Sequence, residues 1–391
     1  MATGEYSSRR PQEHSDSDAY GLSRRDFVFS AGKLVLGAVS GAPLLGAAGD
    51  VRAGAAVPVD RPRTVQRVAV IGAGHYHAIA PPAYLNILRN LHLDIVGVHD
   101  FDPQLAKSRA DLVNSKPFNN YQVMCEQTRP DFVLSLCRHD MMPEPIRYLI
   151  NAGIPFMAEK PWGTDPKTIN DLAELADKKN AWATFPASMR YSQWAQACRE
   201  MYQKNELGPI SHMLIRFNNP GTQRYIDEDS AWMLSKKEAG GGALLNLGIH
   251  GFDLCTYITG EEPKVVAACT SHNICSLPIE DYALVTLKTP SGMIFVNEAA
   301  YTYPVNGSDS EHTVSAKNFL VREVGSSAHV VGNGRDELVK TPPGYVGGWP
   351  GAVADAIDRL RKGLPPTATA RDNARAVTLT FDAYRMAGER A

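Results

Sequence analysis

The sequence has few cysteines, few aromatic residues and no excess of either charge. Its six cysteines are too few to cross-link 391 residues, and they form no C-x-x-C pair or metal-ligand spacing. The 40 basic and 42 acidic side chains give a net charge of −2, which argues against a nucleic-acid-binding protein and suits a small neutral or sugar-like substrate better than a polyanion. A hydrophobic content of 44% is that of a globular chain, not of a disordered protein or a small disulfide scaffold.

The first 55 residues predict an export signal. A polar segment, 1–22, precedes the twin arginines Arg24 and Arg25, a mildly apolar run follows over 29–48, and Ala53-Gly54-Ala55 is typical of a cleavage site. This arrangement indicates the twin-arginine route, with the Tat export machinery as a partner and a periplasmic or extracytoplasmic destination. A retained membrane anchor is the alternative, although the run is short of the roughly 20 strongly apolar residues that a span needs.

The exported part would begin at residue 56, and we expect no integral membrane span in it. Proteins that take this route fold before export, often around a cofactor that is inserted in the cytoplasm. All six cysteines lie beyond the signal, so we expect buried thiols in a protein that folds in a reducing compartment.

Residues 56–186 alternate short apolar runs with helical segments. Expected strands are 68–71, 93–98, 132–136, 156–158 and 181–185, with helices at 102–114, 143–152 and 166–179 between them. Strands that alternate with helices predict βαβ units, and hence an α/β fold with a doubly wound parallel sheet of the Rossmann type.

Residues 187–391 follow a different pattern, which predicts a second, α+β domain. Two helices are expected at 192–205 and 242–257, and two more close the chain at 351–362 and 372–386. Expected strands are 210–217, 264–270, 282–288, 293–300, 318–324 and 329–331, joined by short turns rich in Gly, Pro or Asn. Such turns favour antiparallel pairing in a large, mostly antiparallel sheet.

A dinucleotide site is predicted where the first strand ends. Gly72-Ala73-Gly74 permits a tight turn and a close approach of the backbone to pyrophosphate, while His77 stands where the third glycine of the fingerprint is expected. Asp100 ends the second strand, where a carboxylate accepts hydrogen bonds from ribose hydroxyls. The next residue is Phe101 and not a basic side chain, so NAD is favoured over NADP. Asp100 can equally serve as a turn or helix cap.

His75 and His77 form an H-x-H pair, but no cysteine or carboxylate cluster accompanies them. We therefore predict no metal site, and assign His77 to helix–strand packing or to a phosphate contact.

Two further motifs carry candidate chemistry. Glu159-Lys160-Pro161 follows a buried strand at the sheet edge where ligands bind, and partial burial can lower the pKa of Lys160 into a catalytic range; a structural salt bridge is the alternative. On a helix entered from the glycine turn 240–242, Asn246, His250 and Asp253 fall on one stripe. A histidine that is satisfied within the core is the alternative there.

Gly72-x-Gly74, Glu159-Lys160-Pro161 and the 241–253 motif, in this order, resemble the Gfo/Idh/MocA family of sugar and polyol oxidoreductases over residues 67–386. The resemblance implies a tightly held NAD(P), hydride transfer from a sugar carbinol, and an open C-terminal sheet that forms a homodimer or homotetramer. It implies that Lys160 hydrogen-bonds the reacting hydroxyl and that His250 acts as, or assists, the acid/base. Asn246 stands where many members have Asp; it can orient a hydroxyl but cannot act as a base.

The sequence also departs from the family pattern. Met142 stands where many members have a histidine, which makes Arg138 and His139 candidates for contacts particular to this protein. Three aromatic residues, Tyr225, Trp232 and Tyr301, could stack on a sugar face or pack in the core. The predicted cofactor-binding set is Gly72, Ala73, Gly74, His77, Asp100, Glu159, Lys160 and Arg190, the catalytic set is Lys160, His250 and Asn246, and the substrate-binding set is Asn246, His250 and Asp253.

The sequence therefore predicts an exported NAD-dependent oxidoreductase that moves a hydride between a sugar hydroxyl and a bound nicotinamide. Two alternatives stay open on the same scaffold. One is an NAD-dependent glycosidase or lyase that oxidises C3 transiently and shows no net redox change. The other is a non-catalytic protein that binds a sugar or a nucleotide.

Overall fold

The computed structural model describes residues 64–80, 82–339 and 345–389. The predicted export signal, residues 1–55, lies outside these ranges. Among the described residues, no helix has the length and apolar character that crossing a bilayer requires.

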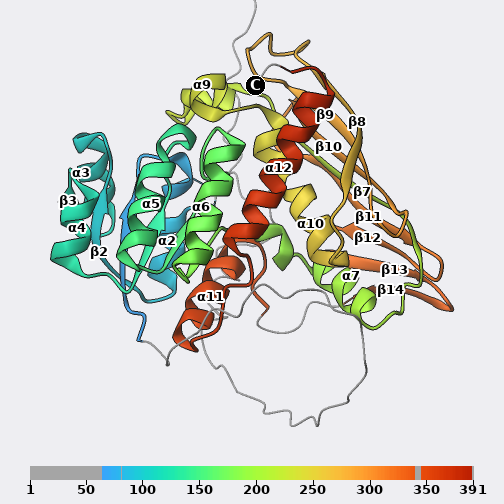
Figure 1. Ribbon diagram of the computed structural model, residues 1–391, viewed down its shortest axis with the longest axis horizontal. Coiled ribbons are helices and arrows are strands. Elements are labelled where there is room, and N and C mark those ends of the chain that lie inside the picture. The colour runs from blue at the N-terminus through green and yellow to red at the C-terminus, as the bar shows by residue number, and fades with distance from the viewer. Residues whose placement is uncertain (1–63, 81, 340–344, 390–391) are drawn as a thin grey trace, which may run out of the picture. The chain divides into compact units, whose positions relative to one another are not determined.

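The first domain, with β2, β3 and helices α2 to α6 in Figure 1, contains a six-stranded, all-parallel sheet. Its strand order is β3-β2-β1-β4-β5-β6, which is the doubly wound Rossmann order. Its strands are β1 (Arg67–Ile71), β2 (Asp94–His99), β3 (Pro117–Phe118), β4 (Phe132–Ser135), β5 (Phe156–Ala158) and β6 (Ala183–Thr184). Every residue of β4 and β5 is buried, as expected for strands with helices on both faces. The predicted α/β class is confirmed.

Helices of this domain begin at side-chain caps that the sequence supplies. Asp102 and Asp165 each accept a hydrogen bond from a backbone N–H of the first turn, and a proline follows each of them. The elements are η1 (Tyr76–Ala78), α2 (Tyr84–Asn90), α3 (Pro103–Leu112), α4 (Tyr121–Thr128), η2 (His139–Met141), α5 (Pro143–Ala152), α6 (Pro166–Lys178) and η3 (Ser188–Tyr191). The short strand β3 and helix α4 were not predicted.

The second domain contains an eight-stranded sheet in the order β14-β13-β12-β11-β7-β10-β9-β8. Its strands are β7 (Ile210–Pro220), β8 (Lys264–Ser271), β9 (Tyr282–Lys288), β10 (Ile294–Tyr303), β11 (Asp309–Ala316), β12 (Leu320–Val324), β13 (Ser327–Gly332) and β14 (Arg335–Val339). Pairing is antiparallel except between β10 and β7, which run parallel because the chain crosses over through several helices after β7. The predicted mostly antiparallel sheet is confirmed, although β11 and β14 were not predicted.

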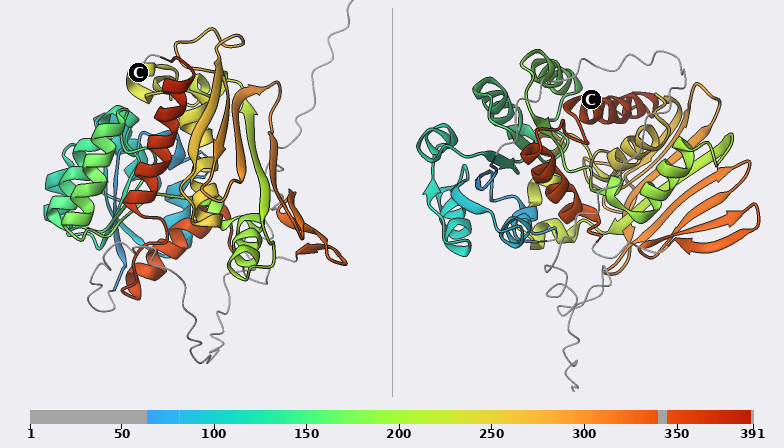
Figure 2. Two further views of the ribbon diagram at one scale, coloured as in Figure 1. Left: turned by 45° about the vertical axis from the view of Figure 1, so that its right-hand side comes forward. Right: turned by 90° about the horizontal axis from the view of Figure 1, so that it is seen from below.

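Helices α7 (Gln193–Gln203), α10 (Ile249–Thr259) and α12 (Ala370–Met386) lie against one face of this sheet (Figure 2). Helix α12 also contacts the first domain, because Asn373 Nδ2 donates to the Pro161 carbonyl at 3.0 Å and Asn170 Nδ2 donates to Thr378 Oγ1 at 3.1 Å. The remaining elements are α8 (Gln223–Asp227), η4 (Ala231–Leu234), α9 (Lys236–Ala239), η5 (Leu244–Gly248, one π-helical turn) and α11 (Gly348–Arg361).

Helix α11 packs on the core of the first domain although it comes late in the sequence. Val353 and Ile357 belong to the same buried cluster as Val68 and Val70 of β1. Arg361 Nη2 donates to the Val65 carbonyl at 2.7 Å, which ties the end of α11 to the residues just before β1. The first sheet is thus covered in part by residues that follow the second.

The cysteines correct one expectation. Cys125, Cys137, Cys198 and Cys255 are buried free thiols, but Cys269 on β8 is exposed and Cys275 is half-buried. Cys269 lies on a strand at the edge of the larger sheet, where alternate side chains face away from the core.

Candidate active site

The glycine turn and Asp100 form one hydrogen-bonded unit. Gly72 has a φ of +74°, and a Cβ there would lie 2.6 Å from the backbone nitrogen of Cys137. The Asp100 carboxylate accepts from Gly74 N at 2.7 Å and from Asp102 N at 2.9 Å. Burial raises the pKa of Asp100, and these two donors oppose the shift. Its carboxylate is therefore oriented at the carboxyl end of β2, where the ribose of a dinucleotide binds in Rossmann domains.

Glu159 directly follows β5 and is held by two side chains, one from η1 and one from α2. His77 Nδ1 lies 3.0 Å from Glu159 Oε1, and Tyr84 Oη donates to the same oxygen at 2.7 Å. Burial would raise the pKa of Glu159, but His77 and the positive charge of Lys160 outweigh it and hold this pKa below its usual range. The ring of His77 is thus engaged by a carboxylate within the protein.

Lys160 and Asn246 bring the two domains into direct contact. Lys160 Nζ donates to the Asn246 backbone carbonyl at 2.8 Å and also to Asn246 Oδ1. Both side chains are buried. Burial lowers the pKa of Lys160 to about 8, and the Glu159 carboxylate opposes that shift.

The turn that precedes Asn246 is fixed by residues far away in the sequence. Glu280 accepts hydrogen bonds from Gly242 N at 2.9 Å and from Leu244 N at 2.8 Å, and Tyr384 of α12 donates to it at 2.7 Å. A Cβ on Gly242 would lie 2.1 Å from the Glu280 carbonyl oxygen, so glycine is required there. The Glu280 carboxylate takes the place of a helix cap for η5 and so positions Asn246.

His250 lies one turn beyond Asn246 and is partly exposed. Burial and the charge of Lys160 lower the pKa of His250 to about 3, so the ring is neutral at physiological pH. His139 behaves in the same way: burial lowers its pKa to about 3, and its Nδ1 lies 2.8 Å from the Ala239 carbonyl. Both rings are therefore uncharged near neutral pH, and the partly exposed ring of His250 can exchange hydrogen bonds with a ligand without adding charge.

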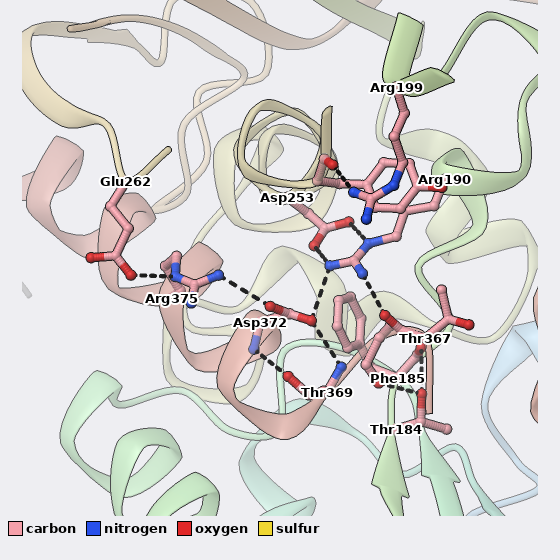
Figure 3. Close-up of polar contacts among 12 residues, drawn as sticks. Thr184, Phe185, Arg190, Arg199, Asp253, Glu262, Thr367, Thr369, Asp372 and Arg375 are labelled. Carbon is pink, nitrogen blue, oxygen red and sulfur yellow. Dashed lines mark hydrogen bonds and ion pairs between the residues drawn. The ribbon is translucent and has the colours of Figure 1, made fainter. Parts of the chain in front are cut away.

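Arg190 and Asp253 pair with each other. Arg190 Nε donates to Asp253 Oδ2 at 2.8 Å, a second nitrogen donates to the other oxygen, and Asp372 lies 3.3 Å away (Figure 3). Arg190 Nη1 also donates to the Thr367 carbonyl at 2.8 Å. Both members of the pair are buried, so the structure gives them a contact inside the protein. Their assignments to cofactor and to substrate stay predictions.

Arg138, one of the two candidates for contacts particular to this protein, also forms ion pairs within the protein. Its guanidinium lies 2.8 Å from Asp140 and 2.7 Å from Glu238. Trp232 packs between the rings of His75 and His139, with centroid distances of 5.5 Å and 4.9 Å. The two histidines belong to the first domain and Trp232 to the second, so these rings pack against each other where the two domains meet.

The described residues fit a dinucleotide and offer no metal site. A Cβ at position 72 would meet the backbone of Cys137, and a Cβ on Gly74 would lie 2.8 Å from Asp100 Oδ2, so a side chain at either position would require a neighbour to move. Within the described ranges, no group of three His, Cys, Asp or Glu side chains is arranged to hold a metal ion. The glycine turn, Asp100 and the lysine at the sheet edge define a Rossmann dinucleotide-binding protein with an attached second domain.

Comparison with known families agrees with this class. Residues 66–185 match the family described as "Oxidoreductase family, NAD-binding Rossmann fold", and residues 195–315 match the "GFO/IDH/MocA C-terminal domain". The two matches together cover more than half of the sequence, and the chain belongs to the Gfo/Idh/MocA family. Its first domain is an NAD-binding Rossmann domain.

Curated relatives are similar over part of their length. D-glucoside 3-dehydrogenase of Escherichia coli (strain K12) is 28% identical over 200 residues, which is 50% of this chain and 54% of that protein. Glucose-6-phosphate 3-dehydrogenase of Bacillus subtilis (strain 168) is 25% identical over 199 residues, which again is 50% of this chain and 54% of that protein. The chain thus spans about half the length of the curated relatives it matches.

Solved structures show the same fold over most of the chain. An inositol dehydrogenase homolog from Azotobacter vinelandii, complexed with NAD+, aligns with a TM-score of 0.73 at 15% identity, covering 84% of this chain and 96% of that one. The aldose-aldose oxidoreductase from Caulobacter crescentus, complexed with glycerol, aligns with a TM-score of 0.71 at 18% identity. The alignment covers 83% of this chain and 98% of that one.

The sequence did not indicate three residues that build the site, namely Tyr84, Glu280 and Tyr384. Each is joined to the predicted motifs only through folding; Tyr384, for example, is 139 residues from Leu245, whose backbone N–H donates to it. The sequence offered one indication of Glu280: two consecutive acidic residues, Glu280 and Asp281, stand directly before the apolar strand β9, where the chain enters the core.

Proposed function

We propose that this protein is an NAD-dependent oxidoreductase that oxidises, or in reverse forms, a hydroxyl of a sugar or sugar derivative. Bound NAD+ would accept a hydride from the carbinol carbon. The hydroxyl proton would pass to Lys160 Nζ, the side chain whose pKa of about 8 is best matched to that transfer near neutral pH.

The hydrogen bonds of Lys160 carry this proposal. A neutral amine has two N–H groups and one lone pair, and Asn246 offers two acceptors to Nζ, its backbone carbonyl and Oδ1. When both N–H groups donate to Asn246, the lone pair is left for the substrate proton. Asn246 orients the base without adding the negative charge that would raise the pKa of Lys160.

His250 would act as a neutral hydrogen-bond partner of the substrate. With a pKa of about 3 it is a weak base, so it orients the hydroxyl while Lys160 takes the proton. Two relatives named as 3-dehydrogenases of glucose derivatives support a pyranose ring as the substrate class.

Conversion of a panel of sugars by the purified protein tests this function. We expect NADH to form with at least one sugar, and Lys160→Met to abolish NADH formation while NAD binding persists. Lys167→Met, which removes an exposed lysine of α6, is the matched control and should leave the rate unchanged. Release of the aglycone from an aryl glycoside without NADH would instead indicate the glycosidase or lyase, and ligand binding without conversion of any sugar would indicate a binding protein.

We further propose that residues 1–55 direct export through the twin-arginine route and that the exported enzyme retains its NAD. Free NAD is scarce outside the cytoplasm, so a useful exported enzyme would keep and recycle its cofactor. Native mass spectrometry should show bound cofactor and a homodimer or homotetramer. Replacement of Arg24 and Arg25 by lysine should leave the protein in the cytoplasmic fraction; export that is unaffected by this change would contradict the assignment.

A further inference from the structure

Arg224 of α8 is a cation whose neighbours are aromatic rings. Its Nη2 donates to the hydroxyl of Tyr225 at 2.8 Å. The guanidinium carbon lies 4.7 Å from the centroid of the Tyr225 ring and 5.6 Å from that of Tyr301. Its Nε is buried and makes no hydrogen bond within the described chain, although the residue as a whole is partly exposed.

No carboxylate among the described residues forms an ion pair with Arg224, in contrast to Arg190 and Arg216. Arg190 has Asp253, and Arg216 has Glu298 at 2.8 Å. A guanidinium that is mostly withdrawn from water is costly unless an anion accompanies it. Aromatic faces supply only part of that compensation.

Hydrogen bonds connect Arg224 to the proposed base. The Tyr225 hydroxyl that accepts from Arg224 also accepts from Asn246 Nδ2 at 2.8 Å, and Asn246 in turn accepts from Lys160 Nζ. Burial is the main cause of the lowered pKa of Lys160, and the positive charge of Arg224 adds to it. Arg224 is therefore within electrostatic reach of the position where the substrate hydroxyl would react.

We propose that Arg224 binds an acidic group of the substrate, a carboxylate or a phosphate, and so selects an acidic sugar over a neutral one. The inference rests on the proposed function, because that function places the reacting hydroxyl at Lys160. A guanidinium has five N–H donors and matches either oxyanion with two parallel ones, and Arg224 gives one of its donors, on Nη2, to Tyr225.

Isothermal titration of the NADH-loaded protein tests the proposal, because NADH prevents oxidation of the added sugar. The ligands are D-glucuronate, glucose 6-phosphate and glucose, and the variants are Arg224→Gln, Arg224→Lys and Arg129→Gln. Arg129 is exposed and precedes β4, so it lies at the amino ends of the parallel strands, away from the site at their carboxyl ends. Arg129→Gln is therefore the control, because it removes the same charge at a distance from the site.

We expect the wild type to bind one of the two acidic sugars more tightly than glucose. Arg224→Gln should lower the affinity for that acidic sugar roughly 10- to 100-fold. Glucose binding and the unfolding temperature should change little, Arg224→Lys should restore part of the affinity, and Arg129→Gln should have no effect. A preference for glucuronate would identify the carboxylate, and one for glucose 6-phosphate would identify the phosphate.

The proposal is wrong if glucose binds as tightly as both acidic sugars, or if Arg224→Gln lowers the affinity for the acidic sugar and for glucose equally. In either case Arg224 only packs against Tyr225 and Tyr301. Failure of the proposed function gives a different result: no sugar would yield NADH with the NAD+-loaded enzyme, while Arg224-dependent binding of the acid would persist.

Discussion

Replacement of Asn246 by Asp would test the role of the uncharged amide beside Lys160. The change keeps the shape of the side chain and places a carboxylate where Oδ1 now accepts from Nζ. An opposite charge at this distance raises the pKa of a lysine by about 1 to 3 units. From a starting pKa of about 8, the ammonium form would then persist through the physiological range, and the fraction of neutral amine at pH 7 would fall about 10- to 1000-fold.

The assay is the pH profile of kcat/KM for sugar oxidation, followed by NADH formation. In the proposed mechanism neutral Lys160 is the active form, so the wild-type rate should rise with pH and level off above about pH 8. In Asn246→Asp the same rise should occur 1 to 3 pH units higher, with recovery of the rate in alkaline buffer. Asn86→Asp adds the same charge on the exposed face of α2 and is the control. Superimposable profiles of Asn246→Asp and the wild type would refute Lys160 as the group that titrates.

Further outcomes concern stability and cofactor binding. The folded-state pKa of Lys160 lies below its usual value of 10.5, so charged Lys160 destabilises the fold. Lys160→Met should therefore raise the thermal unfolding temperature most below pH 8 and progressively less toward pH 10.5. A rise in unfolding temperature that is independent of pH would contradict the lowered pKa. Arg190→Met leaves Asp253 buried without its partner and should cost about 3–5 kcal/mol in denaturant unfolding, with a smaller loss in the double variant Arg190→Met/Asp253→Leu. Gly74→Ala brings a Cβ to 2.8 Å from Asp100 Oδ2 and should weaken NAD binding in a fluorescence titration, and unchanged affinity would argue against a dinucleotide at this turn.

The sequence predicted the parts of the site that lie next to each other along the chain. The turn at Gly72, Lys160 after β5, and the stripe of Asn246 and His250 all depend on local spacing, and the structure brings Lys160 and Asn246 into contact. Whether these residues act in catalysis stays a prediction.

Contacts between distant segments could not be predicted from one sequence. Glu280 is 38 residues from Gly242, whose N–H it accepts, and no periodicity links the two. Strand β11 was missed because its first residues are charged or polar and exposed, so they show no apolar alternation. Arg224 was not singled out in the sequence, because its lack of a carboxylate partner within the described chain is visible only in three dimensions.

The packing of α11 on the first sheet has a consequence for how the protein is made. Helix α11 comes after every strand of the larger sheet, yet it completes the buried cluster around β1, and Trp182 Nε1 donates to the carbonyl of Leu364 just beyond it at 2.9 Å. The ribosome synthesises the strands of the nucleotide domain first and helix α11 near the end, so we expect this domain to complete its buried cluster only when nearly the whole chain has emerged. We therefore expect a product truncated before residue 348 to retain NAD poorly even with every predicted cofactor residue present.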